Sequence, residues 1–213
     1  MSRQGQHLAT ENVMRKVDPA RHEAKRRQII EAALSCFARK GFHGTSTNEI
    51  CAAAGMSPGN LFHYFPNKQA VIAAIAEDDR REMVERFAGL AGQDDVVAAI
   101  EQLAGELLQQ SADPVYARIS IEIAAEAMSN SEIGKLFAAN EARVKADLVA
   151  LLECGIARGQ VDPGLQPELA ATWLIALADG AVGRALMDAD FDAASHAPVL
   201  MRMIRRFLAP SPG

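Results

Sequence analysis

The chain has 213 residues, of which 49% are hydrophobic, 23% are charged and only 5% are aromatic, with a formal net charge of −5. This balance is ordinary for a soluble globular protein, and the length allows one large domain or two small ones. Because alanine and leucine dominate the apolar positions, helices are favoured over sheets, and we expect an all-α fold.

The N-terminal segment has no apolar run of the kind found in a secretory signal, because its first twenty residues are polar. We expect residues 1–21 to form a mobile tail. A helix is predicted over residues 22–40, where apolar residues recur at helical spacing, and Gly41 is expected to end it. Lys25, near its start, is placed to reach a phosphate.

The segment from Thr45 to Lys68 is typical of two short helices joined by a tight turn. Ser46 and Glu49 form a capping box at the start of the first helix, and Gly55 ends it. Ser57 caps the second helix. A helix, a glycine-containing turn and a second helix make up a helix-turn-helix, whose second helix is expected to enter the major groove of DNA.

The polar side chains of that second helix suit contact with DNA. Asn60 is able to bond an adenine edge or a phosphate, and His63 and Tyr64 offer donors to the DNA backbone. Lys68 adds a positive charge at the start of the next helix. The alternative is a helical hairpin whose polar face is merely solvated.

Residues 25–75, KRRQIIEAALSCFARKGFHGTSTNEICAAAGMSPGNLFHYFPNKQAVIAAI, resemble the N-terminal domain of the TetR/AcrR family of bacterial transcriptional regulators. The chain departs from the common pattern at Phe62, where the family often has a phosphate-contacting tyrosine, and at Pro58, where a lysine is frequent. With the capping and helix residues above, the resemblance implies a set of DNA contacts: Lys25, Ser46, Thr47, Asn48, Ser57, Pro58, Gly59, Asn60, Phe62, His63, Tyr64 and Lys68.

Charge is divided unevenly along the chain. Residues 1–68 hold ten Lys and Arg against five Asp and Glu, a net +5, whereas residues 69–213 hold twelve against twenty-two, a net −10. Basic charge therefore accompanies the helix-turn-helix, as phosphate contact requires. We expect residues 22–68 to be the DNA-binding domain, and residues 69–213 to be an effector-binding and dimerisation domain that faces away from DNA.

The second domain begins with a helix predicted over residues 67–88, which connects it to the DNA-binding domain. A sideways shift of the far end of this connector changes the angle of the DNA-binding domain. Glycine, proline and polar turns separate the further helices. These are expected at residues 94–110, 114–128, 131–158, 167–188 and 193–208.

Arg118 and Glu122 are four residues apart on a predicted helix. They form either a surface salt bridge or polar groups within an apolar cavity. The family resemblance implies an effector pocket between the middle helices. The candidate lining residues are Phe87, Leu103, Leu107, Arg118, Glu122, Met128, Phe137, Asn140, Val144, Trp173 and Leu177.

The two C-terminal helices are predicted to form a dimer interface. Residues 170–187 are apolar on more than one face, so burial on both sides is expected. Two helices from each of two subunits then form a four-helix bundle, and the resemblance implies the same dimer. The alternative is the core of a monomer. The interface candidates are Leu174, Ala178, Ala181, Leu186, Val199, Met203 and Phe207.

Cys36, Cys51 and Cys154 lie far apart in sequence, which indicates reduced core residues, with a redox switch as the alternative. The five histidines lack metal-ligand spacing, so we expect neither a metal nor another cofactor. No P-loop or H-E-x-x-H motif occurs, and an enzyme is not expected. Asp179 and Arg184 interrupt the most apolar segment, so no membrane span is expected.

These observations predict a cytoplasmic, homodimeric, DNA-binding regulator of transcription. The resemblance implies a repressor that a small-molecule effector releases from a palindromic operator. Two alternatives remain open within the same class: a regulator without a ligand or controlled by a protein partner, and a thiol-based redox sensor.

Overall fold

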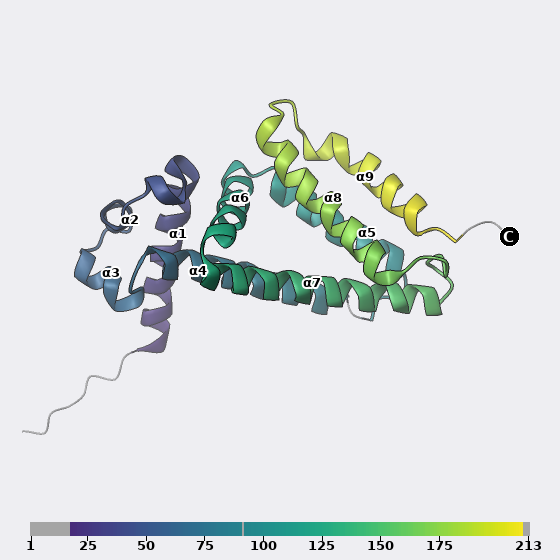
Figure 1. Ribbon diagram of the computed structural model, residues 1–213, viewed down its shortest axis with the longest axis horizontal. Coiled ribbons are helices and arrows are strands. Elements are labelled where there is room, and N and C mark those ends of the chain that lie inside the picture. Colours follow the sequence, from purple (N-terminus) through teal and green to yellow (C-terminus); the bar gives the residue numbers. More distant parts are fainter. Residues whose placement is uncertain (1–17, 91, 211–213) are drawn as a thin grey trace, which may run out of the picture.

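The computed structural model describes residues 18–90 and 92–210. Within these residues the chain forms nine α-helices and no strand, which confirms the predicted all-α fold (Figure 1). The helices are α1 (Pro19–Gly44), α2 (Thr47–Ala53), α3 (Pro58–Tyr64), α4 (Lys68–Leu90), α5 (Val96–Ser111), α6 (Pro114–Ser129), α7 (Ser131–Ala157), α8 (Pro167–Met187) and α9 (Ala193–Leu208).

Helix α1 begins three residues earlier than predicted. Asp18 caps it by accepting hydrogen bonds from the backbone N–H groups of Ala20 and Arg21, and Pro19 occupies the first helical position. Residues 1–17 of the predicted tail lie outside the described residues. The predicted stop at Gly41 appears as a kink, because Gly41 adopts φ 73° and ψ 168° and a short helical turn follows it.

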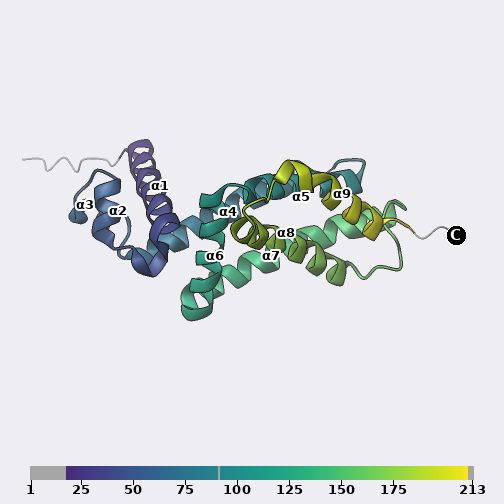
Figure 2. The same cartoon turned by 90° about the horizontal axis from the view of Figure 1, so that it is seen from above.

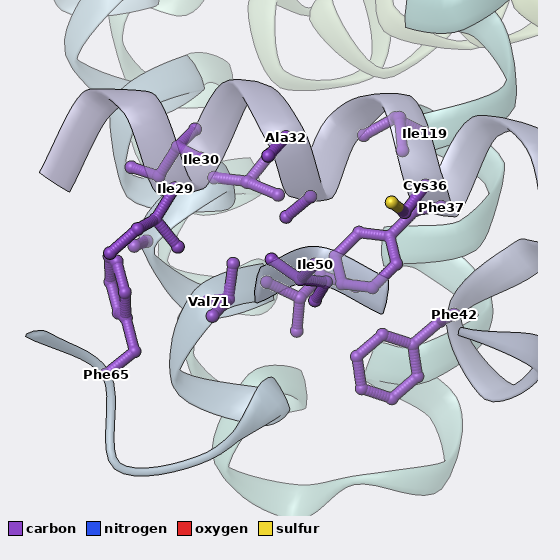
Figure 3. Close-up of a cluster of buried hydrophobic side chains, with 14 of the residues drawn as sticks. Ile29, Ile30, Ala32, Cys36, Phe37, Phe42, Ile50, Phe65, Val71 and Ile119 are labelled. Atoms are coloured by element: carbon purple, nitrogen blue, oxygen red, sulfur yellow. The ribbon is translucent and has the colours of Figure 1, made fainter. Parts of the chain in front are cut away.

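The first three helices and residues 68–76 of α4 form a unit that we call the head. Its hydrophobic core also includes Ile119 and Ile123 of α6 and Ile133 of α7. Phe37, Phe42 and Ile50 are completely or almost completely buried in it (Figure 3). Leu61 is fully buried in the same core. The start of α4 supplies Val71 and its neighbours to the same core, so this core extends past the predicted domain boundary at Lys68.

The rest of α4 and helices α5–α9 form the larger unit, which we call the body. Its buried residues make a second core drawn from α4, α5, α7, α8 and α9. Helix α6 lies between α1 of the head and the body, and it packs against α1, α7 and α8 (Figures 1 and 2).

Helix α8 is apolar nearly all round. By length and composition it would be able to cross a membrane. Only 17% of its most apolar 18-residue stretch is buried within the protein, so it is not a typical core helix. Opposite faces of this helix have different neighbours: Leu174 and Ala178 face the inside of the body, whereas Leu169 and Trp173 are exposed. An apolar helix of this kind needs burial on both sides.

Candidate functional site

Local capping fixes the geometry of the helix-turn-helix. Ser46 and Glu49 form the complete capping box at the start of α2, as predicted from their spacing. The Ser57 hydroxyl accepts from the backbone N–H of Asn60, and Pro58 stands at the first position of α3. These interactions hold a helix of only seven residues that is too short to be stable alone.

Helix α3 carries half of the predicted DNA contacts, and its outer face is exposed. Asn60, Phe62 and His63 are exposed, while Leu61 on the opposite side is buried in the head. Tyr64 is half-buried, and its ring centroid lies 4.7 Å from that of His22 at the start of α1. The outer face therefore presents side chains that are able to donate hydrogen bonds, as well as one exposed aromatic ring.

The predicted Lys68–phosphate contact does not match the structure. The Lys68 ammonium donates to the carbonyl oxygens of Phe42, at 2.6 Å, and Thr45, at 2.8 Å, and it lies 4.4 Å from the Phe42 ring centroid. Its burial lowers the pKa of the Lys68 amine. Lys68 therefore links the turn between α1 and α2 to the start of α4 by hydrogen bonds. Lys25 remains at the surface of α1 and donates to Gln28 Oε1.

The letters from Gly55 to Gly59, GMSPG, match the G-x-S-x-G motif of hydrolases. That motif places its serine on a sharp turn between a strand and a helix. Here Ser57 follows helix α2 and caps α3, so the match is one of letters only.

A cavity of about 780 Å³ lies between helices α4, α5, α6, α7 and α8, with Leu200 and Ile204 of α9 on its wall, and it extends to Arg27, Ile30 and Leu34 of α1. This volume is within the range of small-molecule sites. Seven of the predicted lining residues are on the wall: Phe87, Leu103, Leu107, Phe137, Asn140, Val144 and Leu177.

Four predicted pocket residues lie elsewhere. Arg118 and Glu122 form an ion pair at 3.2 Å on the side of α6 that faces α1, because they are half a helical turn away from the cavity face. Met128, at the end of α6, is 86% exposed. Trp173 is 67% exposed and faces outward from α8, so the single tryptophan is a surface residue.

Carboxyl groups of the cavity wall were missed in the sequence. Asp79, Glu141 and Asp179 all line the cavity. Burial raises the pKa of each carboxyl, with Glu82 adding to the effect at Asp79, and Asp179 and Asp79 adding to it at Glu141. Asp79 is nevertheless accessible to solvent. A carboxyl group that faces a cavity is expected to be both surrounded by protein and accessible to solvent.

Two further polar groups affect this wall. Arg86 partly offsets the raised pKa of Asp79 by its positive charge. Burial, with the charge of Asp79 second, raises the pKa of the Tyr116 hydroxyl to about 12. The sequence signal is the Asp78–Asp79 pair: both residues line the cavity, and Asp78 also forms ion pairs with Arg81 and Arg26.

The predicted interface residues divide between the two faces of α8 and α9. Leu174 is buried, Ala178 and Ala181 are half-buried, and all three line the cavity. On α8 and α9, the large apolar side chains that are exposed are the predicted residues Leu186, Val199, Met203 and Phe207, together with Leu169, Trp173 and Met187.

The outward face of α8 also carries two glycines. A Cβ atom placed at Gly180 or Gly183 would have no neighbour within 4 Å. Small residues on an open face allow another helix to approach closely. A hollow of about 240 Å³ lies between the start of α8 and the end of α9, and Trp173 and Phe207 line it.

The cysteines give no support to a redox pair. Cys36 and Cys51 are buried in the head and Cys154 is half-buried in the body, and all three are free. Burial raises the pKa of the Cys51 thiol, which lowers its reactivity. Among residues 18–90 and 92–210, no group of three His, Cys, Asp or Glu side chains is arranged to hold a metal ion.

Sequence profiles match both units of the chain. The profile described as bacterial regulatory proteins, tetR family, matches residues 29–75, and the profile of the BetI-type transcriptional repressor C-terminal region matches residues 93–209. The second match alone covers more than half of the chain.

Similar proteins extend over nearly the whole length. The HTH-type transcriptional regulator UidR of Escherichia coli K12 is 27% identical over 190 residues, covering 87% of this chain and 94% of UidR. GusR of Salmonella enterica superposes with a TM-score of 0.74 and 28% identity, covering 93% of this chain and 99% of GusR.

A second solved structure is similar in fold alone. FadR of Bacillus subtilis in complex with stearoyl-CoA superposes with a TM-score of 0.75 at 19% identity, covering 85% of this chain and 98% of FadR. The two profile matches establish the class: the chain belongs to the TetR family of bacterial transcriptional regulators and is not an enzyme.

Proposed function

We propose that this protein is a homodimeric, cytoplasmic repressor that leaves a palindromic operator when a small molecule fills the cavity of the body. The observation that carries the proposal is the combination, in one chain, of the exposed helix α3, which we call the reading helix, and a cavity of about 780 Å³. A regulator without an effector has no use for such a hollow, since an unfilled cavity costs stability.

The chemistry of the wall supports a mainly apolar effector with one polar end. Leucine, isoleucine, valine and phenylalanine make up most of the lining. Asp79, Glu141 and Asp179 make no ion pair among the described residues, and Asn140 Oδ1 accepts no hydrogen bond there. A group that donates hydrogen bonds or carries positive charge therefore complements these four side chains, which share the wall with Arg27, Arg80 and Arg143.

The exposed faces of α8 and α9 support the dimer. Trp173, Met203 and Phe207 expose large apolar surfaces there, and patches of this kind mark contact sites. Two copies related by a two-fold axis would place two reading helices on two half-sites. The mechanism is a shift of population: the effector favours a dimer whose heads no longer fit successive major grooves.

Thermal unfolding with a matched set of probes tests the effector cavity. We expect decylamine to raise the Tm more than decanol, and decanol more than decanoate, because a ligand of the folded state stabilises it by mass action. Ala178→Trp, which fills the hollow from α8, should abolish all three shifts. If no probe changes the Tm of the wild-type protein, the result would contradict the proposal and favour the alternative, a regulator without a ligand.

A further inference from the structure

Helix α6 contacts both the cavity and the head. Its cavity face carries Tyr116, Ser120 and Ala124, four residues apart. Its opposite side packs against α1, and Glu122 and Glu126 lie one turn apart on that side. A displacement of α6 by an occupant of the cavity would therefore also move the side chains that contact the head.

Glu122 meets the head at the kink of α1. Because Gly41 leaves the helical conformation, the backbone N–H of Phe42 is free of the helical ladder and donates to Glu122 Oε2 at 2.8 Å. The Glu122 side chain is only 18% exposed. A charge-assisted hydrogen bond in such surroundings is stronger than one between neutral groups.

The Glu122 carboxylate is held on both of its oxygens. Arg118 Nε donates to Oε1 at 3.2 Å, while Oε2 accepts from Phe42. A Cβ atom on Gly41 would lie 3.0 Å from Oε1, so the carboxylate rests directly against the α1 backbone. This close fit ties the position of α6 to the position of the kink.

The same corner of the head is held from α4. Lys68 donates to the carbonyl oxygens of Phe42 and Thr45, so Phe42 is bound through its N–H by α6 and through its carbonyl by α4. Glu126, which is 5% exposed, lies beside this corner on the α6 side, where its Oε2 is 3.3 Å from His43 Nε2 but has no hydrogen-bond partner among the described residues. Residues 42–45 then lead directly into α2.

We propose that Glu122 is the positioning residue that couples the cavity to the head, by transmitting a displacement of α6 through its hydrogen bond to the Phe42 amide. The proposal rests on the effector role of the cavity. Helix α4 supplies the pivot, because its first turns are buried in the head and Arg26 reaches Asp78 at 3.5 Å. Glu122 sets the angle of the head about that pivot.

Pulsed EPR distances between the head and the body test this coupling. Spin labels on Ala53→Cys in α2 and Ala150→Cys in α7, both exposed positions, report the angle in a Cys154→Ser background. Excess unlabelled protein gives each labelled protomer an unlabelled partner. Ala124→Phe, which fills the cavity from α6, replaces an effector. We expect it to shift the head–body distance with Glu122 present, and to lose this effect in Glu122→Ala.

Matched variants separate coupling from stability. Glu122→Gln retains an oxygen acceptor and should retain the shift, whereas Glu122→Leu keeps the volume but not the acceptor and should lose it, even where the alanine variant fails to fold. Glu132→Ala, on the exposed side of α7, should leave the shift intact. All distances are measured well below the Tm of each variant, so lower stability alone does not move them.

Two results would overturn the proposal: an equal shift with and without the Glu122 carboxylate, or no shift from Ala124→Phe when Glu122 is present. Binding of unlabelled wild-type protein to DNA is followed separately by gel shift. Its absence would count against the regulatory function, while leaving the EPR result on Glu122 to be judged independently.

Discussion

The head and the body are both built from helices rich in alanine and leucine, but their interiors differ. The head is filled: Phe37, Phe42, Ile50 and Leu61 expose almost no surface. The body surrounds a hollow of about 780 Å³ with carboxyl groups on its wall. A surface that must match DNA benefits from a rigid core, whereas a domain that responds to a ligand needs space and alternative packings.

Loss of the dimer should be the largest single effect, because it removes one of the two heads from the operator. Met203→Asp places a charge in the exposed apolar face of α9, where Met203 is 49% exposed. We expect a folded monomer by light scattering and at least a hundredfold weaker operator binding, on the order of 3 kcal/mol. Ala194→Asp, an exposed position in the first turn of α9, is the control. A Met203→Asp dimer of normal affinity would place the interface elsewhere.

A matched pair of leucines compares the two cores directly. Leu61→Ala should cost about 2–5 kcal/mol, because Leu61 is fully buried in close packing. Leu177→Ala should cost roughly 1 kcal/mol, because Leu177 already borders a hollow. Urea unfolding of both variants measures the difference. Equal costs would mean that the body is packed as tightly as the head.

Asn60 is the strongest candidate for direct contact with a base. Its side chain is exposed on α3, where two hydrogen bonds to adenine are possible. Asn60→Ala should lower discrimination at one operator position by about 1–3 kcal/mol, while the salt dependence of binding stays unchanged. Competition between single-base operator variants measures this loss. A uniform weakening on all sequences would instead assign Asn60 to a phosphate.

Asp79→Asn should raise stability modestly at neutral pH. Burial raises the pKa of Asp79 in the folded protein above its unfolded value, so the favourable contribution exists below about pH 4 and is lost as pH rises through the folded pKa. The variant avoids this loss, so its Tm should exceed that of the wild type at pH 7. This difference in Tm, the gap, should disappear in acid. Asp94→Asn, at an exposed loop position, should show no gap at either pH.

The fold was predictable because local signals agree with one another along the chain. The capping box at Ser46 and Glu49, the Asp113-Pro114 start of α6 and the Asp192 start of α9 all mark helix ends by short-range chemistry. Predicted helix bounds therefore agree with the observed ones to within three or four residues. The missed start of α1 has the same kind of signal, an Asp-Pro pair at residues 18 and 19.

The site was only partly predictable, because composition does not tell which face of an apolar helix is which. Trp173 and Leu174 are neighbours on α8. Trp173 is predicted to line the cavity and Leu174 to lie at the interface, whereas Trp173 is exposed and Leu174 lines the cavity. Lys68 was assigned to DNA because its charge was visible in the sequence, whereas the carbonyl groups that hold it come from residues more than twenty positions away.

Gel shift of the purified protein on the DNA that flanks its own gene, at two salt concentrations, is the decisive experiment for DNA binding. We expect a specific complex whose affinity falls steeply with added salt, because we expect the exposed face of α3 and the basic head to bind phosphates together with base edges. A folded, dimeric protein that binds this DNA no more tightly than unrelated DNA, at either salt concentration, would contradict this expectation.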